Sequence, residues 1–430
     1  MSKKRYLTSM LIAGCLLLTG CSGEDKETPE KSKFDEPVSI EAVEGLSDDF
    51  IFGCDMSMLI AQENSGVVYY NEAGEEQDVL KTLADNGVNM IRIRVWNNPY
   101  DENGNGYGGG NCDVDNAIAI GKRATEYKMS TFIDFHYSDF WADPSKQMCP
   151  KAWEGMSVDE KADAVYTYTK DSLSKILDAG VDVGMVQIGN EITSGMSGET
   201  DWKNITTLLN SASKAVREIS EQYDKDIQIA VHFTNPEKAG RYAKFAKTLD
   251  DYNVDYDVFA SSYYAFWHGT LDNLKSVLGD IIKDYGKKVM IAETSYAYTY
   301  EDGDDNQNTI YDGAWGEFNY EVSVQGQAEA VRDCVAALAE LGENAIGVCY
   351  WEPAWIPVPG DTDMTRSEIW EKYGSGWASS YAAGYDPEDA GKYYGGSAWD
   401  NQALFDFEGH PLASIEMFGM MAGDIVSEAE

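Results

Sequence analysis

Eight short apolar stretches alternate with helical segments along the chain, and this alternation constrains the fold more than any other feature. The stretches are rich in Val, Ile and Phe, which favour buried strands. A strand and a helix repeated eight times is typical of a (β/α)8 barrel. We therefore predict an α/β protein, a single (β/α)8 TIM barrel with long loops at the carboxyl ends of its strands. The predicted strands are residues 50–55, 90–96, 131–137, 186–191, 227–233, 257–264, 289–293 and 345–352.

Two of the predicted strands end on a glutamate. The fourth ends at Asn190 and Glu191, and the seventh ends at Glu293. The carboxyl ends of parallel barrel strands meet at one face, where barrel enzymes carry their catalytic residues. A single strand-end glutamate is more often a salt-bridge partner, but here many polar and aromatic residues coincide at that face. The predicted substrate-binding residues are Asp55, Arg94, Trp96, His136, Asn190, His232, Tyr263, Tyr264 and Trp351.

Two carboxyl groups that face each other suit glycoside hydrolysis. One carboxylic acid protonates the leaving oxygen, while the other carboxylate attacks the anomeric carbon or activates water. Trp351 would form an apolar floor for a sugar ring, and Asn190 would bond to a sugar hydroxyl. Arg94 would restrain the attacking carboxylate and lower its pKa. The sequence leaves open which of Tyr263 and Tyr264 faces that carboxylate.

The composition excludes some partners and favours others. A net charge of −41 makes nucleic acids unlikely partners and favours a neutral or cationic substrate over a phosphorylated one. The 27 Tyr and 11 Trp residues suffice to line a sugar-binding cleft. The four histidines are scattered and no CxxC or HExxH spacing occurs, so a zinc site is not expected.

The start of the chain resembles the export signal of a bacterial lipoprotein. Three basic residues, 3–5, precede an apolar stretch, 7–18, that is too short to span a membrane. Leu18-Thr19-Gly20-Cys21 then matches the lipoprotein box, in which the cysteine becomes the lipidated first residue. The alternative is an ordinary signal peptide with a chance cysteine. We predict a lipoprotein signal peptide at 1–20, a flexible tether at 21–45, a catalytic domain at 46–422, a tail at 423–430, and export to the cell surface with anchoring through Cys21.

Five cysteines remain after the export segment, and an odd number cannot all pair within one chain. Cys112 and Cys149 follow successive strands in loop-like stretches, so a disulfide between them stays open. Cys54 and Cys349 fall within predicted strands, which predicts buried thiols.

Longer motifs resemble a known enzyme family. The runs that carry the resemblance are Gly53-Cys54-Asp55-Met56-Ser57, Arg92-Ile93-Arg94-Val95-Trp96, Asp134 to Pro144, Val186 to Thr193, Ser262 to Thr270, Glu293-Thr294-Ser295-Tyr296 and Trp399 to Asp406. Together they are similar to the endo-β-1,4-galactanases, family 53 of the glycoside hydrolases in clan A. The resemblance covers residues 50–412, nearly all of the mature chain.

The resemblance implies retaining cleavage of internal β-1,4-galactosidic bonds in galactan or type I arabinogalactan. It implies that Glu191 is the proton donor and Glu293 the nucleophile. We expect a monomer that needs no cofactor for catalysis. Two alternatives stay open. One is another clan A glycosidase, such as a mannanase, cellulase or β-galactosidase. The other is a non-catalytic solute-binding lipoprotein, although such proteins usually have two α/β lobes.

The loop after the seventh strand carries oxygen-bearing side chains at every second position from residue 302 to residue 308. The first part of an EF-hand loop wraps calcium with this spacing, but spacing alone slightly favours a solvated acidic loop. In some bacterial members of the family resembled here, a calcium ties this loop to the one after the eighth strand. The resemblance therefore implies a structural calcium with the ligands Asp302, Asp304, Asn306, Asn308, Ser397 and Asp400.

Overall fold

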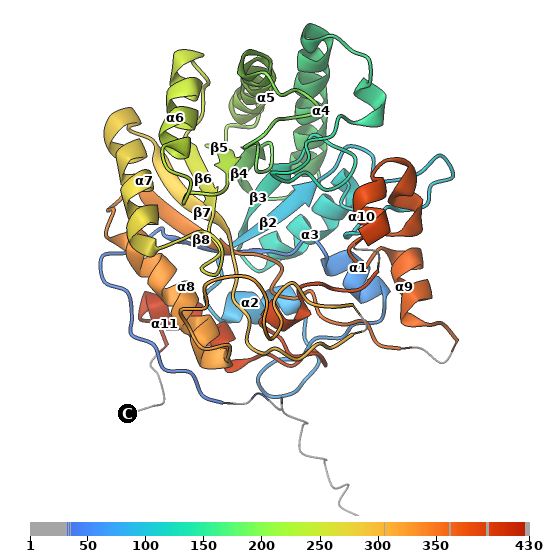
Figure 1. The fold of residues 1–430 in the computed structure, drawn as a ribbon, viewed down its shortest axis with the longest axis vertical. Coiled ribbons are helices and arrows are strands. Elements are labelled where there is room, and N and C mark those ends of the chain that lie inside the picture. Colours follow the sequence, from blue (N-terminus) through green and yellow to red (C-terminus); the bar gives the residue numbers. More distant parts are fainter. Residues whose placement is uncertain are drawn as a thin grey trace, which may run out of the picture.

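Eight parallel strands close into a barrel in chain order, and helices surround it (Figure 1). The computed structural model describes residues 32, 34, 36–304, 306–360, 363–392 and 395–425. Over these residues the predicted (β/α)8 barrel is confirmed. The strands are β1 (Ile51–Asp55), β2 (Met90–Val95), β3 (Ser130–Phe135), β4 (Val183–Ile188), β5 (Gln228–Phe233), β6 (Val258–Ser262), β7 (Lys288–Thr294) and β8 (Ala345–Tyr350).

The long helices bury one side against the barrel, and most of them begin at a side-chain cap. The longest, α5, buries residues 205, 208, 209, 212, 216 and 219, which recur at helical spacing. At the start of α4, Ser157 and Glu160 form a reciprocal capping box. The helices are α1 (Leu59–Asn64), α2 (Val79–Asp85), α3 (Val114–Glu126), α4 (Val158–Asp178), α5 (Trp202–Tyr223), α6 (Arg241–Asp251), α7 (Leu271–Tyr285), α8 (Val324–Ala339), α9 (Arg366–Tyr373), α10 (Pro387–Lys392) and α11 (Met417–Ala422).

The barrel interior changes from apolar to polar toward the carboxyl ends of the strands. Alternate residues of a strand face inward, so β2 contributes first Met90, then Arg92, then Arg94. The apolar part contains Ile51, Met90, Phe132, Met185, Ala230, Val258, Ala260, Met290, Ala292 and Cys349. The buried polar residues beyond it include Asp55, Arg92, Asp134, Gln187, His232 and Ser262. Chemistry is therefore possible at the mouth of the barrel and not in its lower half.

An irregularity in β7 determines where Glu293 points. The pairing of β6 with β7 shifts by one residue just before Ser262 and Glu293. Ala292 packs into the apolar interior, so strict alternation would turn its neighbour Glu293 outward. A β-bulge re-aims the residues beside it. As a result, Glu293 contacts Arg92 inside the barrel.

Two long loops meet above the mouth of the barrel. One is the β7–α8 loop, residues 295–323, and the other follows β8 and includes α9 and α10. The Tyr298 amide donates to the Asn401 carbonyl, and the Thr309 amide donates to the Ala398 carbonyl, each at 2.9 Å. These contacts join segments that lie about a hundred residues apart in the sequence and form one wall of the mouth.

The chain already packs on the barrel before residue 46, the predicted start of the domain. Val38 and Val43 are buried. Ser39 exchanges two hydrogen bonds of 2.9 Å with the side chain of Gln325 on α8. The ring of Phe34 lies edge-on to Tyr298 at 4.9 Å. Cys21, the predicted signal peptide and residues 426–430 of the predicted tail lie outside the described residues. Among the described residues, no helix has the length and apolar character needed to cross a membrane.

The five cysteines in the described part of the chain are free thiols, so Cys112 and Cys149 do not pair. Cys54 and Cys349 are buried within β1 and β8, as the sequence predicts. Burial raises the pKa of the Cys112 thiol to about 12. Thiols held in the protonated form are poor nucleophiles, which makes a catalytic role for this cysteine improbable on chemical grounds.

Candidate active site

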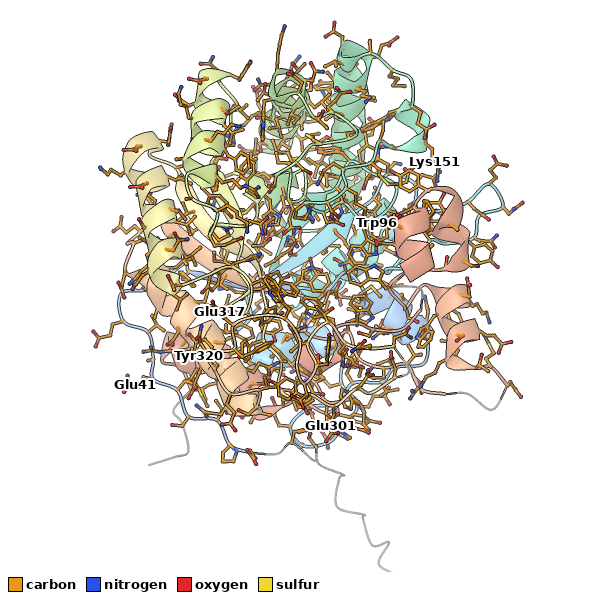
Figure 2. All side chains as sticks on the ribbon, in the orientation of Figure 1. Glu41, Trp96, Lys151, Glu301, Glu317 and Tyr320 are labelled. Atoms are coloured by element: carbon orange, nitrogen blue, oxygen red, sulfur yellow. The ribbon has the colours of Figure 1, made fainter. Side chains whose placement is uncertain are left out.

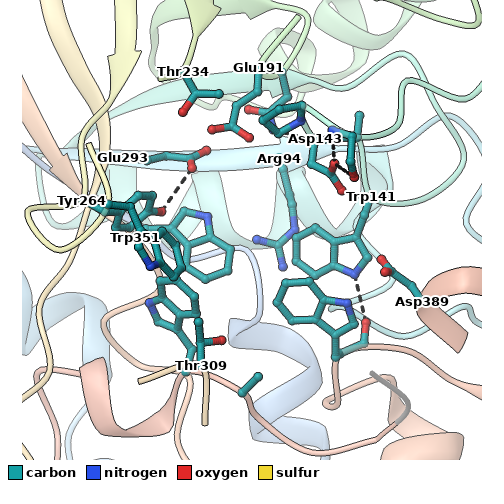
Figure 3. A pocket seen from close by; sticks show the side chains of 18 of the residues that line it. Arg94, Trp141, Asp143, Glu191, Thr234, Tyr264, Glu293, Thr309, Trp351 and Asp389 are labelled. Atoms are coloured by element: carbon teal, nitrogen blue, oxygen red, sulfur yellow. Dashed lines mark hydrogen bonds between the residues drawn. The ribbon is translucent and has the colours of Figure 1, made fainter. Parts of the chain in front are cut away.

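A cavity of about 810 Å³ opens at the mouth of the barrel between the long loops. Both glutamates predicted from the sequence line this cavity, and Figure 3 shows their carboxyl groups facing one another. The predicted substrate-binding residues that also line it are Arg94, His136, Asn190, Tyr264 and Trp351. Seven residues predicted from the sequence thus line one cavity.

The backbone after β4 turns Glu191 into the cavity. Gly189 has φ 102° and Glu191 has φ 42°, both in the left-handed region that residues other than glycine rarely adopt. Ser262 Oγ donates a hydrogen bond of 2.6 Å to Glu191 Oε1. His232 Nε2 lies 2.9 Å from the same Oγ. His232, Ser262 and Glu191 thus form a chain of contacts that orients the carboxyl group of Glu191.

Glu293 lies beside a cation and a phenol. Arg92 Nη1 is 2.9 Å from Glu293 Oε1. The hydroxyl of Tyr264 donates to Glu293 Oε2 at 3.2 Å, as the dashed line in Figure 3 marks. The hydroxyl of Tyr263 instead donates to the Gly269 carbonyl at 2.9 Å. The question left open by the sequence is answered: Tyr264 faces Glu293.

The surroundings distinguish the protonation states of the two glutamates. Burial raises the pKa of Glu191, and the negative charge of Glu293 raises it further. Burial also raises the pKa of Glu293, but the adjacent Arg92 acts in the opposite direction. A buried pair of carboxyl groups does not ionise twice without a large cost. The shared proton therefore resides on Glu191, and Glu293 carries the charge.

The prediction that Arg94 restrains the attacking carboxylate is wrong. Arg94 Nη1 lies 2.5 Å from Glu352 Oε1. Its guanidinium also lies over the ring of Trp141 at 4.4 Å. Arg92 stands two residues earlier on β2, about 7 Å deeper along the strand. From that depth its side chain reaches Glu293, whereas Arg94 lies level with the cavity wall.

Four predicted substrate-binding residues lie behind the cavity wall and position the residues that line it. Asp55 Oδ2 accepts a hydrogen bond from Arg92 Nη1 at 2.9 Å. Trp96 Nε1 donates to His136 Nδ1 at 3.1 Å, so the ring proton of His136 is on Nε2 and points at Asp134, 3.0 Å away. Each of the four is at most 3% exposed. They are Asp55, Trp96, His232 and Tyr263.

Aromatic rings extend the cavity to both sides of Trp351. On one side, Trp141 lies 6.3 Å from Trp351 and stacks on Trp377 at 4.7 Å between ring centroids. On the other side, Trp399 lies 4.8 Å from Trp351, and Trp267 lies 6.2 Å from Trp399. The sequence analysis did not single out these four. Three of them fall within the quoted motifs, but Trp377 lies in a loop where the only signal was the high tryptophan content.

The model of glycosyl hydrolase family 53 matches residues 51–418. The chain belongs to this family. It is similar to an endo-β-1,4-galactanase of Bacillus subtilis (strain 168), with 56% identity over 416 residues that cover 95% of this chain and 96% of the relative. It is also similar to an arabinogalactan endo-β-1,4-galactanase of Cellvibrio japonicus, with 33% identity over 76% of this chain and 87% of the relative.

Solved structures agree with the family assignment. The family 53 catalytic domain of Ignisphaera aggregans superposes with a TM-score of 0.78 and 39% identity, covering 90% of this chain and 99% of that domain. A structure from work on two fungal β-1,4-galactanases gives a TM-score of 0.65 and 29% identity, covering 85% and 98%. The predicted family is confirmed, and the protein is a glycoside hydrolase.

The family 53 chain also holds a group of carboxylates in the two loops above the mouth. Oxygens of Asp302, Asp304 and Asp400 all lie within 4.8 Å of one another. Asn308 Nδ2 donates to Asp400 Oδ1 at 2.6 Å, while the buried Oδ1 of Asn308 has no hydrogen-bond partner. The Ser397 amide donates to Asp304 Oδ2 at 2.8 Å. Three of the six predicted calcium ligands therefore present oxygens in one small volume, and Asn308 contacts one of them.

Burial within this group raises the pKa of Asp304 to about 6. Burial and the charge of Asp304 raise the pKa of Asp400. Asn306 donates its backbone N–H to Asp304 Oδ1 at 2.6 Å, and its side chain lies against Gly396. Carboxylates that resist ionisation in this way are stabilised when a cation joins them.

Tyr264→Phe is expected to lower kcat/KM on β-1,4-galactan about ten- to hundredfold, because a hydrogen bond to a charged group contributes about 1.5–3 kcal/mol. Tyr263→Phe is the matched control, and its kcat/KM should stay within about twofold of the parent. Initial rates are measured after thermal unfolding shows that both variants are folded. Equal losses in the two variants would contradict the assignment of Tyr264.

Proposed function

We propose that the protein hydrolyses internal β-1,4-galactosidic bonds of galactan and type I arabinogalactan. The observation that carries this proposal is a cavity that holds both glutamates and is lined by two groups of aromatic rings beside Trp351, Trp141 with Trp377 and Trp399 with Trp267. A cleft of this kind suits a polysaccharide that passes through it, whereas an exo-acting enzyme needs room on one side only. The names of the Bacillus subtilis and Cellvibrio japonicus relatives support the same substrate.

In this proposal Glu191 is the general acid and Glu293 the nucleophile. Glu191 gives its proton to the departing glycosidic oxygen while Glu293 attacks the anomeric carbon and forms a glycosyl-enzyme. Glu191, now ionised, takes a proton from a water molecule, which attacks the same carbon and releases Glu293. Two inversions leave the β configuration unchanged. The higher pKa of Glu191 and the contact of Arg92 with Glu293 support this division of roles.

Two side chains of the cavity wall are suited to hold the sugar beside Glu293. Asn190 Oδ1 accepts from Arg92 Nη2 at 3.0 Å, and its Nδ2 donates to the Ala142 carbonyl at 2.9 Å. The amide is therefore oriented before the substrate arrives and can bond to a sugar hydroxyl at little entropic cost. Trp351 presents an apolar surface to the sugar face.

Product analysis tests the substrate and the mode of cleavage together. On linear β-1,4-galactan the enzyme should release a mixture of oligosaccharides and lower the viscosity early in the reaction, while mannan, xylan and carboxymethylcellulose stay intact. Glu293→Gln, prepared in parallel, should lose activity by several orders of magnitude, roughly 10⁴-fold or more, which excludes contaminating enzymes. Cleavage of mannan or cellulose instead would identify another clan A activity.

Further measurements on the parent enzyme and its variants test the separate roles of the two glutamates. Proton NMR of early products should show the β-anomer first, and α-product first would contradict a retaining mechanism. Glu191→Gln should keep more activity on aryl glycosides with good leaving groups, because these need no proton donor. The parent enzyme should lose activity as the pH rises through the pKa of Glu191, since the protonated acid is then lost.

We also propose that calcium binds between the two loops above the mouth. Asp302, Asp304, Asp400 and the unpaired oxygen of Asn308 form an oxygen-rich donor set that suits this ion. Asn306 and Ser397 stand beside them as further donors. The ion would neutralise the clustered carboxylates and hold the two loops together, so its effect is on stability and not on the chemical steps.

Chelation by EDTA is expected to lower the melting temperature, and added calcium, but not magnesium, should restore it, because the ion binds the folded form only. Asp304→Ala combined with Asp400→Ala should abolish this response. Asp163→Ala combined with Asp171→Ala, two exposed positions on α4, changes the net charge equally and should keep it. If EDTA leaves the melting curve of the parent unchanged, the proposed calcium site is contradicted.

We further propose export and anchoring of the enzyme at the cell surface through a lipid on Cys21. The support is the basic start, the short apolar stretch and the Leu-Thr-Gly-Cys box. Cys21→Ala should release the protein from the membrane fraction or leave it unprocessed, and mass spectrometry of the parent should show a lipidated first residue. An unchanged membrane-bound distribution of Cys21→Ala would count against the anchor.

A further inference from the structure

Trp315 is unusual among the large apolar side chains that the structure describes. It lies on the β7–α8 loop and is 82% exposed, about twice as exposed as any other of them. Tyr252, the next most exposed together with Tyr300, is 43% exposed. An indole ring left in water gains nothing for folding, because its apolar surface stays hydrated. Its apolar surface is therefore available to contact a ligand.

The backbone that carries Trp315 is fixed against the segment after β6. Trp267 Nε1 donates to the Trp315 carbonyl at 3.4 Å, and the Glu317 amide donates to the Phe266 carbonyl at 2.9 Å. Gly316 between them has φ 155°, and a Cβ there would lie 2.8 Å from the same Phe266 carbonyl oxygen. Figure 2 labels Glu317 and, further along the loop, Tyr320. Trp315 is thus exposed on a backbone that is held in place.

The attachment connects Trp315 to the aromatic side of the cleft. Trp351 lies 4.8 Å from Trp399, and Trp399 lies 6.2 Å from Trp267; each of the three lines the cavity that also holds Glu293. Trp267 then bonds to the backbone of Trp315. A polysaccharide that runs along this row would meet the exposed indole after it leaves the cavity.

We propose that Trp315 is a substrate-binding platform at the outer end of the cleft, where its indole stacks on a galactose ring remote from the bond being cleaved. This inference rests on the proposed function. An aromatic ring held on a fixed backbone loses little conformational entropy on binding, and tryptophan is prominent among residues that dominate binding energy. A contact this far from the reacting bond is equal in the ground state and the transition state. It therefore lowers KM for long chains and leaves kcat unchanged.

The test compares Trp315→Ala with the parent on long linear galactan and on an aryl galactobioside too short to reach the platform. Trp315→Ala is expected to raise KM for galactan about five- to tenfold with kcat unchanged. Kinetics on the galactobioside should not change. Trp315→Phe, which keeps a smaller ring, should recover part of the lost affinity. Tyr252→Ala, at the end of α6, removes another exposed ring and should behave as the parent.

The outcomes separate the two proposals. If the parent does not cleave galactan, the proposed function fails before Trp315 is tested. If the parent cleaves galactan and Trp315→Ala has the same KM, the platform is disproved. A loss of equal size on galactan and on the galactobioside would show that Trp315 supports the loop and does not bind a distant sugar.

Discussion

The site depends on one buried guanidinium. Arg92 contacts Asp55 and Glu293, each at 2.9 Å, and Asp134 at 2.8 Å. One positive charge thus serves three carboxylates, and removal of one member of a buried ionic group typically costs about 3–5 kcal/mol. Glu191 contacts the Ser262 hydroxyl and not the guanidinium. The carboxyl group outside the reach of Arg92 retains its proton, so Glu191 and Glu293 are distinguished by their distance from Arg92. The proposed roles of acid and nucleophile require this distinction.

Small departures from regular structure complete the arrangement. Left-handed backbone at Glu191, after β4, and a bulge before Glu293, on β7, turn two glutamates toward one cavity, although β5 and β6 separate their strands in the barrel. The barrel supports the site rigidly, whereas the loops shape the cavity that a substrate enters. One loop, residues 295–323, carries both the carboxylates at 302 and 304 and the exposed ring of Trp315. The proposed calcium site and the proposed sugar platform therefore belong to the same segment.

The barrel could be predicted from the sequence because its strands are buried on both faces and therefore consist of short apolar runs. The two glutamates could be predicted because they stand at the carboxyl ends of such runs, where the strands meet the mouth of the barrel. The sequence could not distinguish Arg92 from Arg94, since both face inward and only their depth along β2 differs. The sequence could not show which of Tyr263 and Tyr264 faces Glu293, because the regular alternation of side chains between the two faces of the strand ends before these residues. Trp377 and Trp315 lie in loops, where the sequence has no periodic pattern that would indicate which side chains face the cleft.

The packing of the first described residues limits how far an anchored enzyme could stand from its membrane. Phe34 already contacts Tyr298, and it stands thirteen residues after Cys21. Fully extended, they span at most about 45 Å, whereas a linker free up to residue 45 would span roughly 85 Å. If Cys21 carries the anchor, the cleft lies within about one protein diameter of the membrane surface. An enzyme held in this way would reach only polysaccharide that comes close to the cell surface.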